Sequence, residues 1–361
     1  MLRRVSRPLL TDLRAKSIRV GCASGFWGDS RLSTKQLVDK GDLDYLVYDY
    51  LSEITMSLMV GARMRKPDMG YAPDVLTSLA PHFSQLRERG TRVVCNAGGV
   101  NPTGCAEAMQ KAAEKAGFKD LKIAAIGGDQ VFQDGYMTSN AYFGAESVVE
   151  ALNRGAEIVL TGRLTDSALI LGPAIHEFGW KMNDWDKLAA GSCAGHIVEC
   201  GAQCSGGNHT DWQDVADSWW DVGFPIAVID ESGEFEITKS PGTGGKVSYA
   251  TVAEQLTYEV GNPAAYLLPD VACDFSQANI QDVAENRVKV TGKFYFLKLF
   301  FLLMTNFQAL PDVHRRTPSS WAAQNSPDSA PIYRCIWVDE IAKPKRMRLA
   351  MRCSSALKMN L

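Results

Sequence analysis

Short apolar or β-branched runs alternate with longer stretches of helical periodicity from residue 17 to about residue 266, and this alternation most constrains the fold. Runs of β-branched residues bounded by turn residues are typical of strands, whereas apolar residues at i, i+3, i+4 and i+7 are typical of helices. Strands that alternate with helices are joined by crossovers, which favours a mainly parallel sheet. We therefore predict an α/β fold in which helices flank such a sheet.

The expected elements follow this pattern along the chain. The expected strands are 18–23, 43–48, 91–96, 121–126, 157–161 and 225–229. The expected helices are 34–40, 51–62, 73–89, 102–116, 143–154, 167–178 and 185–200. A smaller α+β extension is expected over 212–291, with strands at 234–238 and 287–290, a helix at 247–260 and a hairpin turn at 231–233. We interpret 1–16 as a basic N-terminal segment, 17–292 as the α/β domain, and 293–361 as a divergent tail that we expect to be poorly ordered.

The composition limits the class of protein. A chain of 361 residues can bury a core without disulfides, and its nine cysteines, an odd number without a secretory signal, indicate reduced thiols in an intracellular protein. The longest apolar run, 294–304, is shorter than the ~20 residues that span a bilayer and contains Lys298, so no membrane association is expected. Whether the protein forms a homo-oligomer is left open.

The net charge of −3 is unevenly distributed. Residues 1–19 contain six basic side chains and one acid, which leaves a net charge of −8 on the rest of the chain. This start resembles a mitochondrial transit peptide, although Pro8 would interrupt an amphipathic helix there. We expect a cytoplasmic protein, with the mitochondrial matrix as the alternative. An acidic body gives no reason to expect nucleic-acid binding.

Polar residues and glycines follow four of the expected strands. These strand ends carry Asp29, Asn96 with Asn101, Asp129, and Arg163. Ligands of open α/β sheets bind beyond the carboxyl ends of strands, where backbone amides and helix N-termini converge, so we predict one shared crevice that binds a negatively charged group. The alternative is a set of ordinary tight turns, and Asn101 before Pro102 also matches a simple helix start.

Three side chains are candidates for proton transfer. Arg163 could grip a carboxylate or phosphate bidentately beside Asp166, although the two could equally form a surface pair with Asp166 as a helix cap. His196 and Glu199 are spaced i, i+3 and would share one helix face, as a general base and its partner or as a satisfied histidine pair. The catalytic candidates are thus Asp166, His196 and Glu199.

Two further glycine-rich loops are candidate binding elements. Asn208 lies in the polar loop 206–212, which could hydrogen-bond a substrate. Gly242, Thr243 and Gly244 lie in the loop 241–246, which lacks the Walker pattern but could form an anion-binding nest with Lys246.

No cofactor is identified and no metal ligand is assigned. Cys193, Cys200, Cys204 and His209 do not have the usual zinc spacing. A carboxylate-ligated metal that uses Asp29, Glu53 or Asp129 remains a third hypothesis.

A combination of motifs resembles the acyclic terpene utilisation protein A family from about residue 17 to residue 292. The motifs lie at 21–29, 41–56, 96–102, 161–163, 176–180, 194–202, 206–208 and 241–245. The resemblance implies a role in the catabolism of branched acyclic compounds such as citronellol or geraniol, processed as acyl-CoA thioesters, and implies no specific reaction. The sequence departs from the family after 292, which suggests a truncated or mis-spliced product that could be inactive.

The leading hypothesis is a catabolic enzyme that acts on a small molecule, a branched carboxylic acid or acyl-CoA thioester, by acid–base chemistry. The alternative is a non-catalytic protein that binds such an intermediate or holds a partner enzyme.

Overall fold

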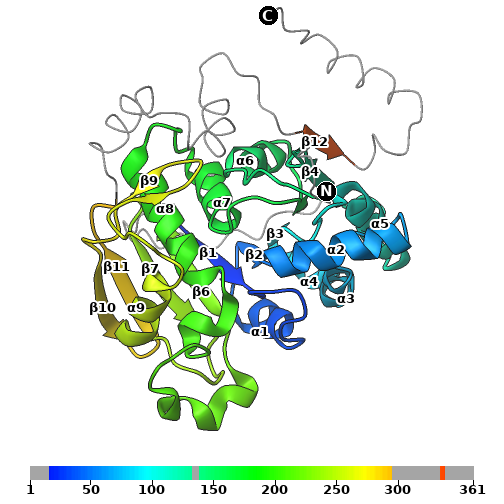
Figure 1. Ribbon diagram of the computed structural model, residues 1–361. Helices are drawn as coiled ribbons and strands as arrows, with labels where there is room; N and C mark the ends of the chain where they lie inside the picture. The colour runs from blue at the N-terminus through cyan, green and yellow to red at the C-terminus, as the bar shows by residue number, and fades with distance from the viewer. Residues whose placement is uncertain (1–15, 132–137, 295–333, 338–361) are drawn as a thin grey trace, which may run out of the picture.

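A ten-stranded mixed sheet organises the computed structural model, which describes residues 16–131, 138–294 and 334–337 (Figure 1). The strand order is β10-β11-β7-β6-β1-β2-β3-β5-β4-β12. Within these residues no helix is long and apolar enough to cross a membrane.

The central half of the sheet is parallel, which confirms the predicted α/β class. Its strands are β1 (Ser17–Cys22), β2 (Tyr45–Tyr48), β3 (Arg92–Cys95), β5 (Ile158–Thr161) and β4 (Ile123–Gly127). Because the carboxyl ends of these five strands all lie on the same side of the sheet, the residues that follow the strands are brought together.

The other strands pair antiparallel. β6 (Pro225–Asp230) pairs with β1, and β7 (Phe235–Lys239), β11 (Arg287–Thr291) and β10 (Asn279–Ala284) continue outward from it. The expected α+β extension therefore continues the main sheet. β12 (Arg334–Trp337) pairs with β4 at the opposite edge, and β8 (Tyr266–Leu267) with β9 (Ala272–Cys273) forms a separate ribbon.

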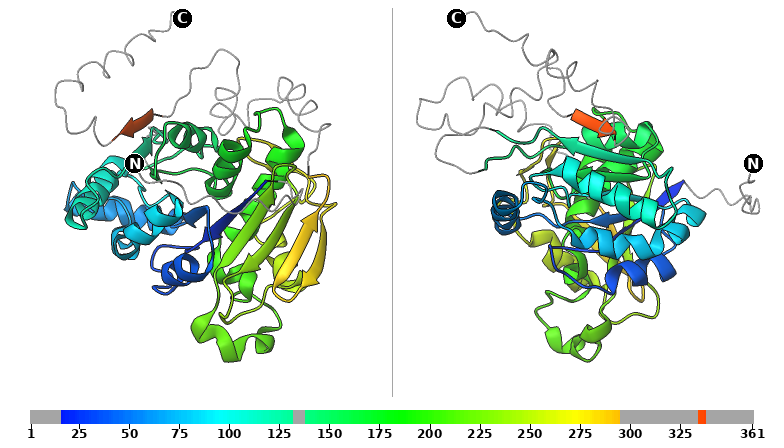
Figure 2. Two further views of the ribbon diagram at one scale, coloured as in Figure 1. Left: turned by 180° about the vertical axis from the view of Figure 1, so that it is seen from behind. Right: turned by 90° about the vertical axis from the view of Figure 1, so that its right-hand side faces the viewer.

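Helices cover both faces of the sheet (Figures 1 and 2). On one face Leu37, Met59 and Met109 pack with strand residues such as Val93, and on the other Leu169 and Ile197 pack with Val94. This alternation along β3 places neighbouring residues in different cores. The first face is covered by α1 (Ser33–Lys40), α2 (Glu53–Arg65), α3 (Asp74–Leu79), α4 (Phe83–Arg89) and α5 (Pro102–Lys115). The second face is covered by α6 (Glu146–Asn153), α7 (Ala168–Phe178), α8 (Trp185–Val198) and α9 (Tyr249–Thr257).

Several sequence predictions need correction. The single helix expected at 73–89 is instead α3, a 3₁₀ turn η1 (Ala80–His82) and α4, because Pro81 cannot donate a backbone hydrogen bond within a helix. The helix expected at 247–260 begins at Tyr249, where Ser248 caps it with Thr251 in a reciprocal capping box. Strands β8, β9, β10 and β12 were not predicted. The expected tail lies outside the described residues apart from 293, 294 and β12, and so does the N-terminal segment 1–15.

Candidate functional site

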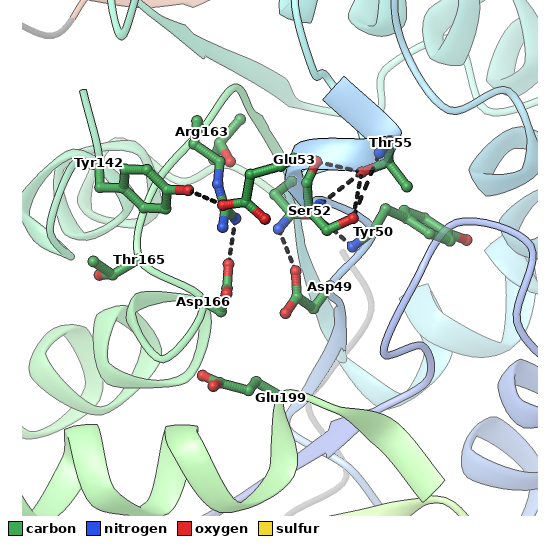
Figure 3. A network of polar contacts seen from close by, with 12 residues as sticks. Asp49, Tyr50, Ser52, Glu53, Thr55, Tyr142, Arg163, Thr165, Asp166 and Glu199 are labelled. Carbon is green, nitrogen blue, oxygen red and sulfur yellow. Dashed lines mark hydrogen bonds and ion pairs between the residues drawn. The ribbon is translucent and has the colours of Figure 1, made fainter. Parts of the chain in front are cut away.

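A buried polar cluster lies where β2, β3 and β5 end and where α8 ends (Figure 3). Asp49 directly follows β2, Asn96 follows β3, and Glu199 follows the last residue of α8. Gly195 allows α8 to approach the start of α7, because a Cβ atom at this position would lie 2.6 Å from the carbonyl oxygen of Ser167. The approach brings the end of α8 next to the segment that carries Arg163 and Asp166.

Asp49 is held by Asn96. The Asn96 side-chain amide donates to Asp49 Oδ1 at 2.5 Å, and its own oxygen accepts from the backbone N–H of Tyr50 at 2.7 Å. Asp49 is only 4% exposed, and Asn96 is fully buried. The ends of β2 and β3 are therefore locked together, with one carboxylate oxygen of Asp49 left without a hydrogen bond to any described residue.

Arg163 is the cation of the cluster. Its guanidinium donates to the Asp166 carboxylate and lies 4.3 Å from the centre of the Tyr142 ring. Its backbone N–H donates to Asp129 Oδ2 at 2.9 Å. Gly162 makes this approach feasible, since a Cβ atom there would lie 2.5 Å from Asp129 Oδ1.

His196 and Glu199 form a buried pair one helical turn apart. His196 Nδ1 lies 3.1 Å from Glu199 Oε1, and the two residues are 1% and 6% exposed. Tyr266 and Phe275 pack against the imidazole at centroid distances of 5.4 and 6.1 Å. His196 Nε2 has no hydrogen-bond partner among the described residues. The backbone carbonyl groups of Leu256 and Tyr258 lie close enough to His196 to oppose the lowering of its pKa.

The carboxylates of the cluster resist ionisation. Burial, with the neighbouring Asp166 carboxylate, raises the pKa values of Asp49 and Glu199 well above their ordinary range. Burial also raises the pKa of Asp166, although the Arg163 guanidinium opposes this shift. Burial lowers the pKa of His196, so its neutral form is favoured. Burial lowers the pKa of Arg163 too, but Asp166 and Asp49 outweigh it and the net shift is upward.

The comparison with protein families gives one decisive result. The model of the acyclic terpene utilisation family protein AtuA matches residues 18–294. The chain belongs to this family. No curated protein and no solved structure matches it. In this family member, the matched region contains every residue of the cluster.

The structure brings Asn96, Asp129 and Arg163 to the carboxyl ends of the parallel strands, where Asp129 accepts from the Arg163 backbone N–H, and His196 joins them through Glu199. The Arg163 guanidinium, which we expect to grip an incoming anion, is bonded to Asp166 through one nitrogen and lies against the Tyr142 ring. The alternative of a surface pair is wrong, because Arg163 is only 6% exposed. Asp166 does not cap α7, since its N-cap residue is Ser167, without a side-chain cap.

Asp29 and Asn101 serve local structure. The Asp29 carboxylate accepts from the backbone N–H groups of Gly25 and Ser30 at 2.9 and 2.6 Å. Asn101 caps α5 by accepting from the Gly104 N–H, and its amide donates to the Asp68 and Met69 carbonyls. These bonds match the alternative of ordinary turn and helix-start chemistry.

The two glycine-rich loops do not join the cluster contacts. Asn208 is exposed. In the 241–246 loop, the Gly244 N–H donates to the Asp221 carbonyl at 2.7 Å and the Gly245 N–H to the Ser218 hydroxyl at 2.9 Å. The buried Lys239 ammonium donates to the carbonyl and hydroxyl oxygens of Thr243. In the expected nest, the amides of Gly244 and Gly245 therefore already have intramolecular partners, and the oxygens of Thr243 accept from a lysine.

No group of three or more His, Cys, Asp or Glu side chains in the described part of the chain has the arrangement of a metal site. His209, a zinc candidate, instead pairs with Glu254 at 3.0 Å. Glu53, a carboxylate candidate, accepts from the Tyr142 hydroxyl at 2.8 Å.

Sequence reasoning missed Asp49, Tyr142 and Glu259. The sequence could have identified Asp49, because Asp49 follows a strand in the same way as Asn96 and Arg163 do. Tyr142 and Glu259 carried none, since both lie on distant loops, and Glu259 is exposed and acts on the cluster only through its charge. Glu259 stands at φ 59°, a left-handed conformation unusual for glutamate, and its charge raises the pKa values of Asp166 and Glu199.

Proposed function

We propose that the protein is an enzyme that acts on a branched carboxylic acid or its acyl-CoA thioester by acid–base chemistry. Family membership supports the substrate class, and the buried cluster supports the chemistry. The observation that carries the proposal is the gathering of Asp49, Asp166 and Glu199 around a single arginine, beside a histidine with an unpaired nitrogen. Carboxyl groups in such surroundings can hold and release protons near neutral pH.

The environments of the carboxyl groups suggest a division of roles. The bond from Arg163 favours the ionised form of Asp166, which makes Asp166 the proton acceptor. Glu199 has no cation bonded to it in the part of the chain that the structure describes and is protonated more readily, which makes it the proton donor. His196 Nδ1 contacts Glu199 Oε1 and orients its carboxyl group, and the proton that Asp166 accepts returns to Glu199 before the next cycle. Titratable groups whose environments separate their pKa values are typical of acid–base pairs.

The test uses the CoA thioesters and free acids that correspond to citronellol and geraniol. The protein is incubated with each in D₂O, and mass spectrometry follows both product formation and deuterium incorporation. The variants are Asp166→Asn and Glu199→Gln, and the matched control is Glu114→Gln, which changes an exposed carboxylate in the last turn of α5.

We expect the wild-type protein to convert or exchange at least one compound. Each site variant should lose roughly 100-fold or more of that rate, the scale of general acid–base catalysis, while the control keeps it. Thermal unfolding verifies that the variants fold. Unchanged rates in both site variants would remove these roles. Binding without exchange or product in the wild type would support the non-catalytic alternative.

A further inference from the structure

Helix α2 is apolar on the face that it turns to solvent as well as on the face that it buries. Its inner face packs on the core through Met56 and Met59. Its outer face carries Ile54, Leu58 and Met64, and each of these side chains is more than half exposed. In Figure 1, α2 lies at the front of the molecule, and no described element covers its outer face. A helix that is apolar on both faces is typical of one that is covered on both faces.

We propose that the outer face of α2 is the interface of a homodimer, in which it pairs with the same helix of a second copy. The two helices run antiparallel about a twofold axis close to Met59. This axis sets Ile54 of each copy opposite Met64 of the other, because the two residues lie five positions on either side of it. The Leu58 side chains of the two copies meet beside the axis. Every exposed apolar side chain of α2 is then covered by an apolar side chain of the second copy.

The charges at the two ends of α2 favour a second copy over other partners. The exposed Glu53 begins the helix, and the exposed Arg65 ends it. The axis that aligns the apolar residues also sets Glu53 of each copy opposite Arg65 of the other, so that two opposite-charge pairs flank the apolar contact. A parallel arrangement would instead bring like charges together. One helix thus carries both halves of the interface, as a twofold contact requires.

The proposed interface borders the buried polar cluster. Glu53 also accepts from the Tyr142 hydroxyl at 2.8 Å, and the Tyr142 ring lies 4.3 Å from the Arg163 guanidinium. Arg65 of the second copy would therefore lie next to the carboxylate that holds Tyr142 over Arg163. The dimer is thereby connected to the cluster through two contacts.

The first experiment measures the mass of the full chain by analytical ultracentrifugation. Leu58→Lys places a charge in the middle of the apolar contact. Leu267→Lys is the matched control, because Leu267 is also about half exposed but lies in the β8–β9 ribbon, away from α2. We expect the wild type and the control to dimerise, and Leu58→Lys to weaken the dimer at least about 100-fold, the scale of a lost hot spot. Thermal unfolding verifies that Leu58→Lys folds.

The second experiment tests the antiparallel register by charge reversal. A homodimer of Glu53→Arg sets arginines opposite each other at both ends of the interface, and a homodimer of Arg65→Glu sets glutamates opposite each other. We expect each variant alone to dimerise at least about 10-fold more weakly than the wild type. An equal mixture of the two variants restores both opposite-charge pairs and should dimerise like the wild type. This rescue requires that both variants fold and that residues 53 and 65 meet between copies.

A wild type that is monomeric over about a hundredfold range of concentration would overturn the proposal. A dimer that Leu58→Lys leaves intact would overturn it as well, because the contact would then lie on another surface. A mixture of the charge variants that associates as weakly as its components would contradict the antiparallel pairing on which the proposal rests. None of these results depends on the proposed acid–base chemistry, because mass is measured without a substrate.

Discussion

Strands β2 and β3 carry a polar cluster at each end, and the two clusters are built differently. At the amino end, the Tyr45 hydroxyl donates to Glu177 at 2.8 Å, and Arg92 donates to His176 Nε2 at 2.7 Å. His176 Nδ1 also has a partner, Asn153, at 2.6 Å. At the carboxyl end, three carboxyl groups face one arginine and His196 Nε2 has no partner among the described residues.

This difference in hydrogen-bond partners indicates which of the two clusters has a structural role. At the amino end the Tyr45 hydroxyl, both ring nitrogens of His176 and the Glu177 carboxylate each have a partner, and Lys16 balances the charge of Glu177 at 3.2 Å. Such a cluster stabilises the fold and needs nothing more. The carboxyl-end cluster buries Asp49 and Glu199 with raised pKa values and leaves His196 Nε2 without a partner among the described residues, which costs stability and is typical of a functional site.

Removal of Arg163 should have the largest effect on this comparison. Arg163→Met leaves the buried Asp49 and the part-exposed Asp166 without their cation, and we expect a loss of about 3 kcal/mol in the free energy of unfolding. Chemical denaturation measures it. Arg92→Met at the amino end is the matched control and should cost clearly less, because His176 is held neutral by its surroundings. Equal losses would remove the distinction between the clusters.

Two isosteric substitutions sharpen the comparison in activity. Glu199→Gln should lower the rate found for the wild type by roughly 100-fold, because it removes a proton donor. Glu177→Gln should leave that rate unchanged and cost about 1 kcal/mol of stability through its bond to Tyr45. Enzyme assays and thermal unfolding of the same samples measure both quantities. A loss of activity in Glu177→Gln as large as in Glu199→Gln would contradict the account.

Gly195 tests the packing that assembles the carboxyl-end cluster. Gly195→Ala places a methyl group 2.6 Å from the Ser167 carbonyl oxygen, so α8 must shift away from α7. We expect a loss of about 1–3 kcal/mol and a weakened site. Gly61→Ala is the matched control, because a Cβ atom there would meet open space and the backbone φ is negative, and it should be neutral or stabilising. Gly117→Ala does not serve as a control, because Gly117 has a positive φ. A neutral Gly195→Ala would show that the close approach is not required.

The pH dependence should differ in sign between the two ends. The pKa of Glu199 is raised in the folded protein, so its contribution to stability is present below its unfolded pKa and is lost as the pH rises through the folded value. The pKa of Glu177 is lowered: burial raises it, but its bonds to Tyr45 and Lys16 outweigh that effect. Its contribution is present above the unfolded pKa and is lost as the pH falls through the folded value.

Stability curves of Glu199→Gln and Glu177→Gln between pH 4 and 8 measure these contributions. Relative to the wild type, Glu199→Gln should gain stability as the pH rises, and Glu177→Gln should lose it. This is the smallest effect that we predict. Parallel curves for the two variants would contradict the assignment.

The sequence predicted the architecture better than the contacts. The parallel core followed from periodicity, and the polar residues after strands followed from a general rule of open sheets. The same rule applies to Asp49, but the strand end that carries Asp49 has no glycine, which was the signal that marked the other strand ends. The pKa of a carboxyl group depends on how deeply the group is buried. The spacing of Arg163 and Asp166 predicted that the two pair, but it did not predict that Arg163 is buried.

The glycine-rich loops show a limit of a different kind. The pattern around Gly244 suited an anion nest, yet its amide is taken by Asp221, more than twenty residues earlier in the chain. Competition from distant segments for backbone groups is decided by tertiary packing, which local patterns do not contain. The same applies to Tyr142, which reaches Arg163 through a loop without periodicity.

The central claim is that the carboxyl-end cluster stores a proton at neutral pH, and infrared difference spectroscopy tests it most directly. Protonated carboxyl groups give a carbonyl band distinct from that of carboxylates. At pH 7.5 we predict such a band in the wild type and in Glu177→Gln, and its loss in the Asp49→Asn, Glu199→Gln double variant. The absence of the band in the wild type, or its persistence in the double variant, would contradict the account.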